Sequence, residues 1–368
     1  MSIRRSALLP APAFAVPIVI LAVCLNIPAM YGQSKTSSFS SDDVQVSVSS
    51  ADRASAHSAA RVYKHAYFSR TPAGMAARHQ AARSRLAAAA ASSALSSSAV
   101  AGDDFTQNPG DVSYQGGATV EFAKSHAVYL NPGGECTIAG CWGNPERFLD
   151  DVGESDFINV LDQYVGLHGS GRYTVGSRAV LKGALPTTPL LESDLIAILH
   201  GVVAKTGASG YGHIYHLFLP PGVDTCFDPP DNNICYSPDN FATFGFCAYH
   251  DSVTYTDFGH VLFTVEPWQG PGSFCEDSPV GAPNGQLADS TNDTLSHELF
   301  ETISDPDGDA WWNTVNLALG GNEIGDECLF FGPDGFLAEP TFRADGHLYR
   351  VQSEYSNQKH ACAISPRN

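Results

Sequence analysis

The stretch from Asp289 to Asp309, DSTNDTLSHELFETISDPDGD, decides how we expect the C-terminal part of this chain to fold. Ser290 or Thr291 can cap the N-terminus of a helix, and Asp293 then lies in the first turn, where a carboxylate is favourable. Pro306 ends this helix, because the residue before a proline is disfavoured in helical geometry. We therefore predict a single helix across this stretch.

The spacing of side chains along this helix predicts two different sides. A buried stripe is predicted for the apolar residues that recur every four positions: Leu295, Leu299 and Ile303. His297 and Glu301 are also four residues apart, so they point the same way, roughly opposite the stripe. An imidazole and a carboxylate one turn apart can chelate one divalent ion, and Glu298 is then placed to reach its bound water.

The segment His297-Glu298-Leu299-Phe300-Glu301 resembles the HExxH helix of zinc metallopeptidases, the zincins, with a glutamate in place of the second histidine. The resemblance implies that His297 is a zinc ligand and that Glu298 is the general base. It also implies a zincin-like fold, with a mixed sheet packed against the active-site helix. The departure at Glu301 makes the ligand set richer in oxygen, which leaves the identity of the metal open.

A third metal ligand must come from another segment, and two candidates stay open. The gluzincin branch of the family takes a glutamate downstream of the helix, and Glu323 matches that position here. The metzincin branch takes a residue closer to the helix, and Asp307 matches that one. We prefer Glu323, and Asp326 is then placed to hold a ligand histidine through its free ring nitrogen.

Other candidate site residues lie outside the helix. Asp305, Asp307 and Asp309 alternate along a segment with Pro306 and Gly308, which is typical of a turn or of a calcium loop. His250 and Tyr355 are candidate donors to the oxyanion of a hydrolytic transition state. For His250 we prefer a structural role as a hydrogen-bonded residue beside a disulfide.

The N-terminal 32 residues have the order of a secretory signal, with Arg4 and Arg5 ahead of an apolar run over 11–25 and then small residues. Nine cysteines include Cys24 in this segment, and the even number that remains predicts disulfides in an exported chain. The simplest pairing joins nearest neighbours: Cys136–Cys141, Cys226–Cys235, Cys247–Cys275 and Cys328–Cys362. We expect a secreted, extracellular or periplasmic protein without stable membrane insertion after signal cleavage.

The rest of the chain divides by composition. Residues 33–105 are rich in Ala and Ser, and we expect a basic prosegment or linker that is largely disordered or helical, with a helix over 75–95. Residues 106–368 carry most of the 39 Asp and Glu, against 20 Lys and Arg in the whole chain. This acidic domain excludes a nucleic-acid partner, because phosphates would be repelled. If residues 33–105 are a prosegment and not a spacer, this basic segment could lie across a cleft of the acidic domain until it is removed.

The elements expected in residues 106–368 favour an α+β fold. We predict strands within 119–130 and over 213–219 and 259–265, and helices capped by Ser155 and Ser193. The segment between the last two strands is rich in Pro, Asp, Asn and Cys, which predicts a stapled surface loop. Helices come first, then strands, then the helix with His297.

A second and wider similarity is to the EXORDIUM, or phosphate-induced, extracellular proteins of plants. The shared order of features is a strand, a Phe-Cys segment with a His, a Pro-rich stretch, an HEL helix with an Asp-Pro turn, and a Glu before a Cys: 214–219, 246–250, 267–283, 297–306 and 323–328. The sequence thus supports an exported zinc-dependent hydrolase of a peptide or protein substrate. The alternatives are a non-catalytic cell-wall protein on the same scaffold and a structural domain with a calcium loop.

Overall fold

The computed structural model describes residues 43–67, 110–185, 188–313, 323–329, 331–332, 335–336 and 340–366. The predicted signal over 1–32 and the predicted helix over 75–95 lie outside these residues. All the described residues fall in one unit of the chain, Ser40–Asn368. No helix among the described residues is long and apolar enough to cross a membrane.

An eight-stranded mixed sheet organises this unit, in the order β1-β6-β4-β8-β12-β11-β2, with β5 paired to β4. Its strands are β1 (Val44–Val46), β2 (Ala60–Tyr67), β4 (Ala123–Leu130), β5 (Tyr173–Val175), β6 (Ala179–Leu181), β8 (His213–Phe218), β11 (Ala248–Tyr255) and β12 (Gly259–Glu266). The strands from β1 to β12 run parallel, and β11 is antiparallel to both β12 and β2. The predicted α+β class with a mixed sheet is confirmed.

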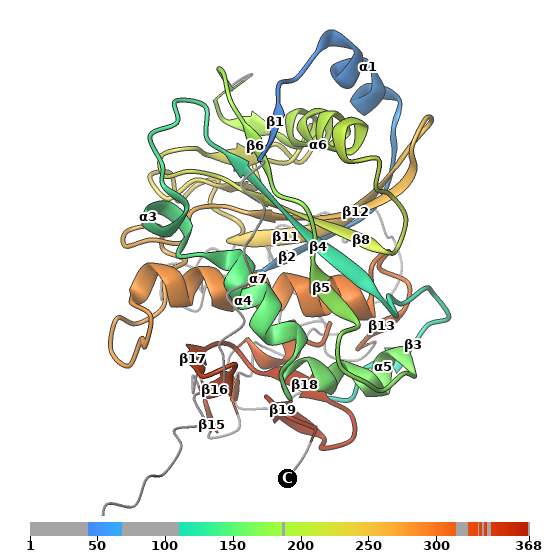
Figure 1. The fold of residues 1–368 in the computed structure, drawn as a ribbon, viewed down its shortest axis with the longest axis vertical. Helices are drawn as coiled ribbons and strands as arrows, with labels where there is room; N and C mark the ends of the chain where they lie inside the picture. Colours follow the sequence, from blue (N-terminus) through green and yellow to red (C-terminus); the bar gives the residue numbers. More distant parts are fainter. Residues whose placement is uncertain are drawn as a thin grey trace, which may run out of the picture. The chain divides into compact units, whose positions relative to one another are not determined.

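Two long helices cover opposite faces of this sheet: α6 (Glu192–Thr206) and α7 (Gln286–Ser304) (Figure 1). Val128 and Leu217 pack with the α6 side of the core, whereas their sheet neighbours Tyr129 and Phe218 pack with the α7 side. Successive residues of a strand point to opposite faces, so one strand serves both cores. The central strands are therefore nearly continuous runs of buried residues.

Both long helices begin earlier than the capping residues predicted. In α6 the Asp194 carboxylate accepts from the Leu191 backbone N–H at 3.1 Å, while the Ser193 hydroxyl donates to Asp228 at 2.9 Å. In α7 the Ser290 hydroxyl donates back to the Gln286 carbonyl at 2.6 Å, inside the helix. The prediction that Ser193 caps α6 and that Ser290 or Thr291 caps α7 was wrong. In α7 the residues before Ser290 include good helix formers, so the helix begins ahead of it. The end of α7 before Asp305 is confirmed.

Shorter elements complete the unit. The helices are α1 (Ser50–Ser58), α3 (Ile138–Trp142), α4 (Pro145–Gly153), α5 (Asp162–Val165) and the 3-10 helices Ile158–Leu161 and Asp326–Cys328. The small strands are β3 (Ser113–Tyr114), β7 (Leu190–Leu191), β9 (Thr225–Cys226), β10 (Cys235–Tyr236), β13 (Trp311–Trp312), β14 (Phe331–Gly332), β15 (Gly335–Phe336), β16 (Thr341–Ala344), β17 (His347–Arg350), β18 (Glu354–Ser356) and β19 (Ala361–Ala363). Ser155 does cap its turn, because its hydroxyl accepts from the Phe157 N–H at 3.1 Å.

The disulfide pairing expected from nearest neighbours is confirmed. The four bonds are Cys136–Cys141, Cys226–Cys235, Cys247–Cys275 and Cys328–Cys362. The predicted stapled loop between β8 and β12 does contain the Cys226–Cys235 hairpin, but it also contains β11, which the sequence did not predict. Four disulfides indicate an oxidising, extracellular environment.

Within the segment predicted to be disordered or helical, residues 43–67 form both strand and helix. β1 pairs with β6 and β2 pairs with β11, and α1 lies between them in the chain. These strands obtain their backbone hydrogen bonds from sheet edges that already exist, so they need no apolar core of their own. The prediction from composition asked only whether the segment could form its own apolar core, so it missed this pairing.

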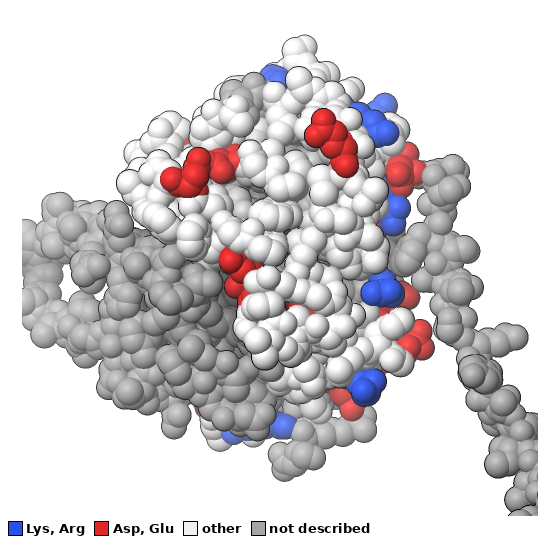
Figure 2. Space-filling model, turned by 90° about the vertical axis from the view of Figure 1, so that its left-hand side faces the viewer, with Lys and Arg blue, Asp and Glu red and all other residues white. Residues whose placement is uncertain are grey.

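Charged side chains are dispersed over the surface that can be seen. On the described part of the face drawn in Figure 2, Lys and Arg alternate with Asp and Glu among uncharged residues. That part of the face carries no continuous basic patch of the kind a phosphate backbone would require.

Candidate metal centre

The pair predicted on the long helix comes together as expected. His297 Nε2 lies 3.1 Å from Glu301 Oε2, and both side chains are 0% exposed. The helix itself is buried on every side from Asp289 to Ser304, so the polar side of His297 faces other protein atoms, not solvent. The two groups therefore need partners inside the protein.

Two further segments deliver those partners. Glu323 stands just before the 3-10 helix Asp326–Cys328, and its Oε2 lies 3.2 Å from His250 Nε2 on β11. The same His250 nitrogen lies 3.6 Å from Glu301 Oε2. Four side chains from three parts of the chain thus converge, and each of them is fully buried.

The separations within this cluster can be compared with those in a metal site. Ligands at about 2.0–2.1 Å from a tetrahedral zinc ion lie about 3.3–3.4 Å from one another. The three contacts, at 3.1, 3.2 and 3.6 Å, lie around that value. The residues present therefore fit a divalent ion in either of two overlapping groups that share Glu301: His250, Glu301 and Glu323, or His297, Glu301 and Asp326.

Backbone and amide groups hold the carboxylates and His297 in place. The Asp326 backbone N–H donates to Glu301 Oε1 at 3.1 Å, and Asp326 Oδ2 accepts from the Glu323 N–H at 3.3 Å. Asp326 forms one group of candidate ligands with His297 and Glu301, and the Nδ1 nitrogen of His297 is contacted by Gln352 at 3.1 Å. A ligand histidine is normally oriented through its second ring nitrogen in this way.

The Gln352 contact sets a condition for metal binding. Its amide nitrogen also donates to the Gly325 carbonyl at 2.6 Å, so Nδ1 of His297 faces a donor. An imidazole that binds a metal through Nε2 carries its proton on Nδ1. The Gln352 amide must therefore turn so that its oxygen accepts the Nδ1 proton when a metal binds.

Gly325 is required where the chain passes over the cluster. A β-carbon at this position would lie 2.5 Å from His297 Nδ1 and 2.8 Å from Glu301 Oε1. Real side chains do not approach so closely, so the backbone of 323–326 can contact the helix only at a glycine. The segment between Glu323 and Asp326 is built around that close contact.

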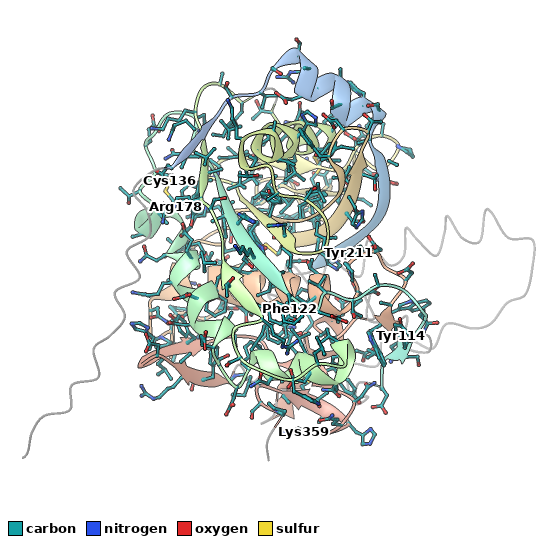
Figure 3. All side chains as sticks on the ribbon, turned by 45° about the vertical axis from the view of Figure 1, so that its right-hand side comes forward. Tyr114, Phe122, Cys136, Arg178, Tyr211 and Lys359 are labelled. Carbon is teal, nitrogen blue, oxygen red and sulfur yellow. A yellow bond between two sulfur atoms is a disulfide. The ribbon has the colours of Figure 1, made fainter. Side chains whose placement is uncertain are left out.

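Asp307, the alternative third ligand, binds elsewhere. Its carboxylate accepts from Ser252 at 2.6 Å and from Tyr211 at 2.5 Å, and it pairs with His260 at 3.1 Å (Tyr211 is labelled in Figure 3). Burial would raise the pKa of Asp307, but these three partners outweigh it and lower the pKa to about 2. Asp307 therefore ties the turn after α7 to the β11–β12 hairpin.

The residues of the predicted calcium loop contact different parts of the protein. Asp305 Oδ1 accepts from the Ala310 N–H at 2.7 Å, and burial, with Glu323 nearby, raises the pKa of Asp305 to about 8. The backbone of Asp309 accepts from the Gly117 N–H at 2.8 Å. Two groups of metal-ligand side chains occur among the described residues, His250-Glu301-Glu323 and His297-Glu301-Asp326, and neither includes Asp305, Asp307 or Asp309.

The remaining predicted residues are buried as well. Glu298 is 0% exposed and follows His297 on α7. The Tyr355 hydroxyl donates to Asp111 at 3.0 Å, and its backbone N–H donates to the Ile324 carbonyl at 2.8 Å. Burial, together with Asp111, raises the pKa of Tyr355, so its hydroxyl stays protonated. Tyr355 thus fixes the position of the segment beside Glu323.

Sequence reasoning missed two members of the site. His250 was assigned a structural role, because the strand that aims it at the helix was not predicted. Gln352 leaves no local pattern, since it reaches His297 from a segment that follows β17. For His250 the signal was weak, because Tyr249, Val253 and Tyr255 favour a strand whereas Ala248 and Asp251 do not.

Comparison with known proteins adds nothing to this geometry. No protein family, curated protein or solved structure matches this chain. The site must therefore be interpreted from its own residues.

Proposed function

We propose that this chain is an exported, zinc-dependent hydrolase of peptide or protein substrates, with a zincin-like arrangement of its site. His297, Glu301 and Glu323 are the proposed ligands, His250 adjoins them, and Glu298 is the proposed general base. The observation that carries the proposal is the convergence of two imidazoles and two carboxylates at 3.1–3.6 Å in a fully buried position. Ionisable groups are seldom buried together unless a counter-charge balances them.

The chemistry follows from the side chains at this cluster. A divalent ion bound there supplies a Lewis acid, which acidifies water and polarises a carbonyl group. Glu298 takes the proton of the attacking water on its carboxylate and delivers it to the nitrogen of the leaving amine. Gln352 holds the imidazole of His297 in one orientation, and the Asp326 N–H does the same for the Glu301 carboxylate.

One observation favours the second hypothesis, a non-catalytic extracellular protein with the same scaffold. All four candidate ligands are 0% exposed, so a metal held among them would lie away from solvent. Such a closed site is typical of structural zinc. If the non-catalytic protein also holds a metal, the two hypotheses differ in whether the metal keeps a position open for water.

The test is to secrete the chain, measure bound metal by elemental analysis, and assay cleavage of casein. We expect about one equivalent of zinc, and we expect Glu298→Gln to keep the zinc while activity falls by at least about a hundredfold. Glu276→Gln, on a partly buried residue of a loop before α7, is the matched control and should retain activity. Zinc without activity in any form of the chain would support a structural zinc site, whereas absence of bound metal would refute the hydrolase and leave the non-catalytic protein.

A further inference from the structure

The strand β2 borders both the strand and the helix that carry candidate ligands. It pairs antiparallel with β11, and His65 of β2 stands opposite His250 in the register. β2 also contacts α7, the helix that carries His297 and Glu301 (Figure 1). The N-terminal segment therefore runs along the junction between the two elements that supply the ligands.

The helix α1, which precedes β2, is anchored to the opposite side of the sheet. Asp52 lies 2.7 Å from His200 of α6, and the same histidine lies 3.0 Å from Asp257. Arg53 adds a contact to Asp194 at 3.4 Å. Since β1 pairs with β6 at the other end of the sheet, residues 43–67 reach both of its edges.

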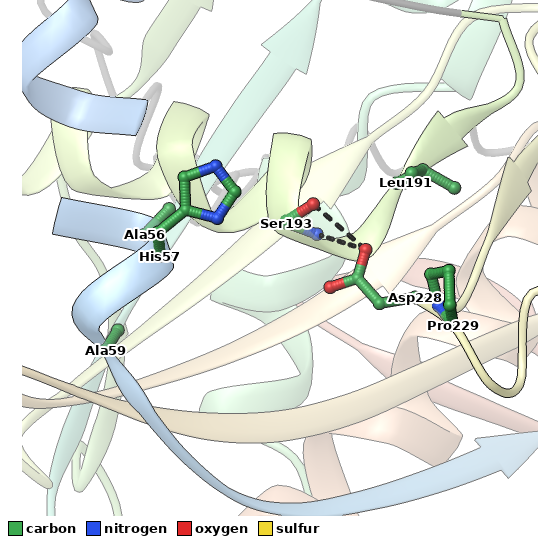
Figure 4. Close-up of a pocket in the computed structure, with 7 residues that line it drawn as sticks. All are labelled: Ala56, His57, Ala59, Leu191, Ser193, Asp228 and Pro229. Carbon is green, nitrogen blue, oxygen red and sulfur yellow. Dashed lines mark hydrogen bonds between the residues drawn. The ribbon is translucent and has the colours of Figure 1, made fainter. Parts of the chain in front are cut away.

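The contact between α1 and the rest of the unit leaves a gap. A depression of about 460 Å³ separates Ala56 and His57 from Ser193 and Asp228 (Figure 4). The Ser193 N–H and hydroxyl both donate to Asp228, so this side satisfies its own polar groups without the segment. The segment meets this surface through a few small apolar side chains, of which Val46 and Ala56 are buried in the same core as α6.

We propose that residues 43–67 are a built-in inhibitor, in which β2 occupies the free edge of β11 and closes the metal cluster of the uncleaved chain. An edge strand presents unpaired N–H and C=O groups, and an added strand satisfies them. Any extended polypeptide that reaches β11 must first displace β2. The inference rests on the proposed function for its consequence, but not for the placement of β2.

The position of the segment in the chain determines how it is released. Residues 68–109 connect β2 to the rest of the unit, and a cut there would leave residues 43–67 bound by noncovalent contacts alone. Cleavage and dissociation are then separate steps. The cut chain would stay closed until the fragment leaves, and a fragment supplied in excess would close it again.

The experiment places a specific protease site at Ser96–Ser98 of the full chain and compares the uncut, the cut and the fragment-free protein. The first readout is amide hydrogen exchange of β11, which needs no metal. We expect β11 to stay protected after cutting, to exchange at least about tenfold faster without the fragment, and to regain protection with a synthetic peptide of residues 43–67. Release of zinc to a chelator and cleavage of casein should follow the same order.

Two single proline variants of the uncut chain control for the possibility that the fragment-free form exchanges quickly only because it unfolds. Successive residues of a strand point their N–H groups to opposite sides, so only one of His65→Pro and Ala66→Pro removes a bond to β11. We expect one variant to expose β11 and the other to leave it protected. Equal exchange in both variants, or protection of β11 without the fragment, would overturn the inhibitor.

The outcomes separate this inference from the proposed function. If β11 opens and zinc is released faster but casein is never cut, the inhibitory strand stands and the peptidase does not. If the uncut chain cuts casein as fast as the fragment-free chain, the peptidase stands and the inhibitory strand does not.

Discussion

The two helices that cover the central sheet bury very different side chains. α6 buries an apolar surface in which Leu195, Ile198 and Leu199 are all 0% exposed. α7 buries its own apolar stripe, Leu295, Leu299 and Ile303, but also ionisable side chains at 0–1% exposure: Asp289, Asp293, His297, Glu298 and Glu301. α6 is buried over Leu195–Val203 and α7 over Asp289–Ser304, and the buried ionisable side chains of α6 are Glu192 and His200.

The comparison shows which face is built for stability alone. An apolar side chain in a core contributes roughly 1.5–3 kcal/mol, whereas a buried carboxylate costs free energy unless it is paired. Among the described residues, buried Asp and Glu far outnumber the buried cations, Arg172 and Arg350. A face that accepts this cost is selected for what it binds.

The largest effect is expected from removing a ligand on α7. Glu301→Gln should lower zinc affinity by more than about a hundredfold, since loss of an outer partner alone costs about 10–100-fold. It should also abolish the rise in melting temperature that zinc gives the unaltered chain. The measurement is zinc titration with a competing chelator, followed by thermal unfolding with and without zinc.

The matched change on the other face is Leu199→Ala on α6. It should destabilise the protein by about 2–5 kcal/mol through cavity formation and leave zinc affinity unchanged. If the α6 variant lost zinc as readily as the α7 variant, the two faces would not differ in the way described here.

The next effect separates the two candidates for the third ligand. Glu323→Gln should lower zinc affinity by at least about tenfold, because its carboxylate lies in the cluster. Asp307→Asn should leave zinc affinity within about twofold and destabilise the protein by about 1–3 kcal/mol, because it weakens the contacts to Ser252, Tyr211 and His260. Zinc loss in the Asp307 variant alone would reverse the assignment.

A smaller effect is expected at Gln352. Gln352→Leu removes the group that orients His297 while keeping a side chain of similar size, and zinc affinity should fall by about 10–100-fold. Gln352→Glu keeps an acceptor for the Nδ1 proton but loses the donation to the Gly325 carbonyl, so it should bind zinc more tightly than Gln352→Leu. A pair of variants that bind zinc equally would exclude the orienting role.

The smallest effect concerns Asp52, which anchors α1 to α6. Burial would raise the pKa of Asp52, but hydrogen bonds with Ser49 and His200 lower it below the ordinary value. A carboxyl group with a lowered pKa in the folded state stabilises above its unfolded pKa of about 3.9 and loses that contribution as the pH falls. Exchange of α1 amides should therefore rise below about pH 4. At neutral pH, Asp52→Asn should lower the free energy of local opening of α1 by about 1 kcal/mol, as acid does in the unaltered chain.

The elements that the sequence predicted are those with local signals. The strands at 213–219 and 259–265, the helix before Pro306 and the approach of Glu301 to His297 follow from short-range periodicity. The four disulfides joined nearest neighbours. Helix starts were less predictable. A serine favours the N-cap position, but it can also lie inside a helix when the residues before it are good helix formers, as they are before Ser290.

By itself the sequence determined the helix with its paired imidazole and carboxylate, since a spacing of four residues puts side chains on one side of any helix. Only the tertiary structure decided that Glu323, and not Asp307, lies beside Glu301 and His250, that Gln352 contacts His297, and that residues 43–67 complete the sheet. These contacts connect segments far apart in the chain. Sheet pairing and burial bring these segments together, and neither can be predicted from the local spacing of residues in the sequence.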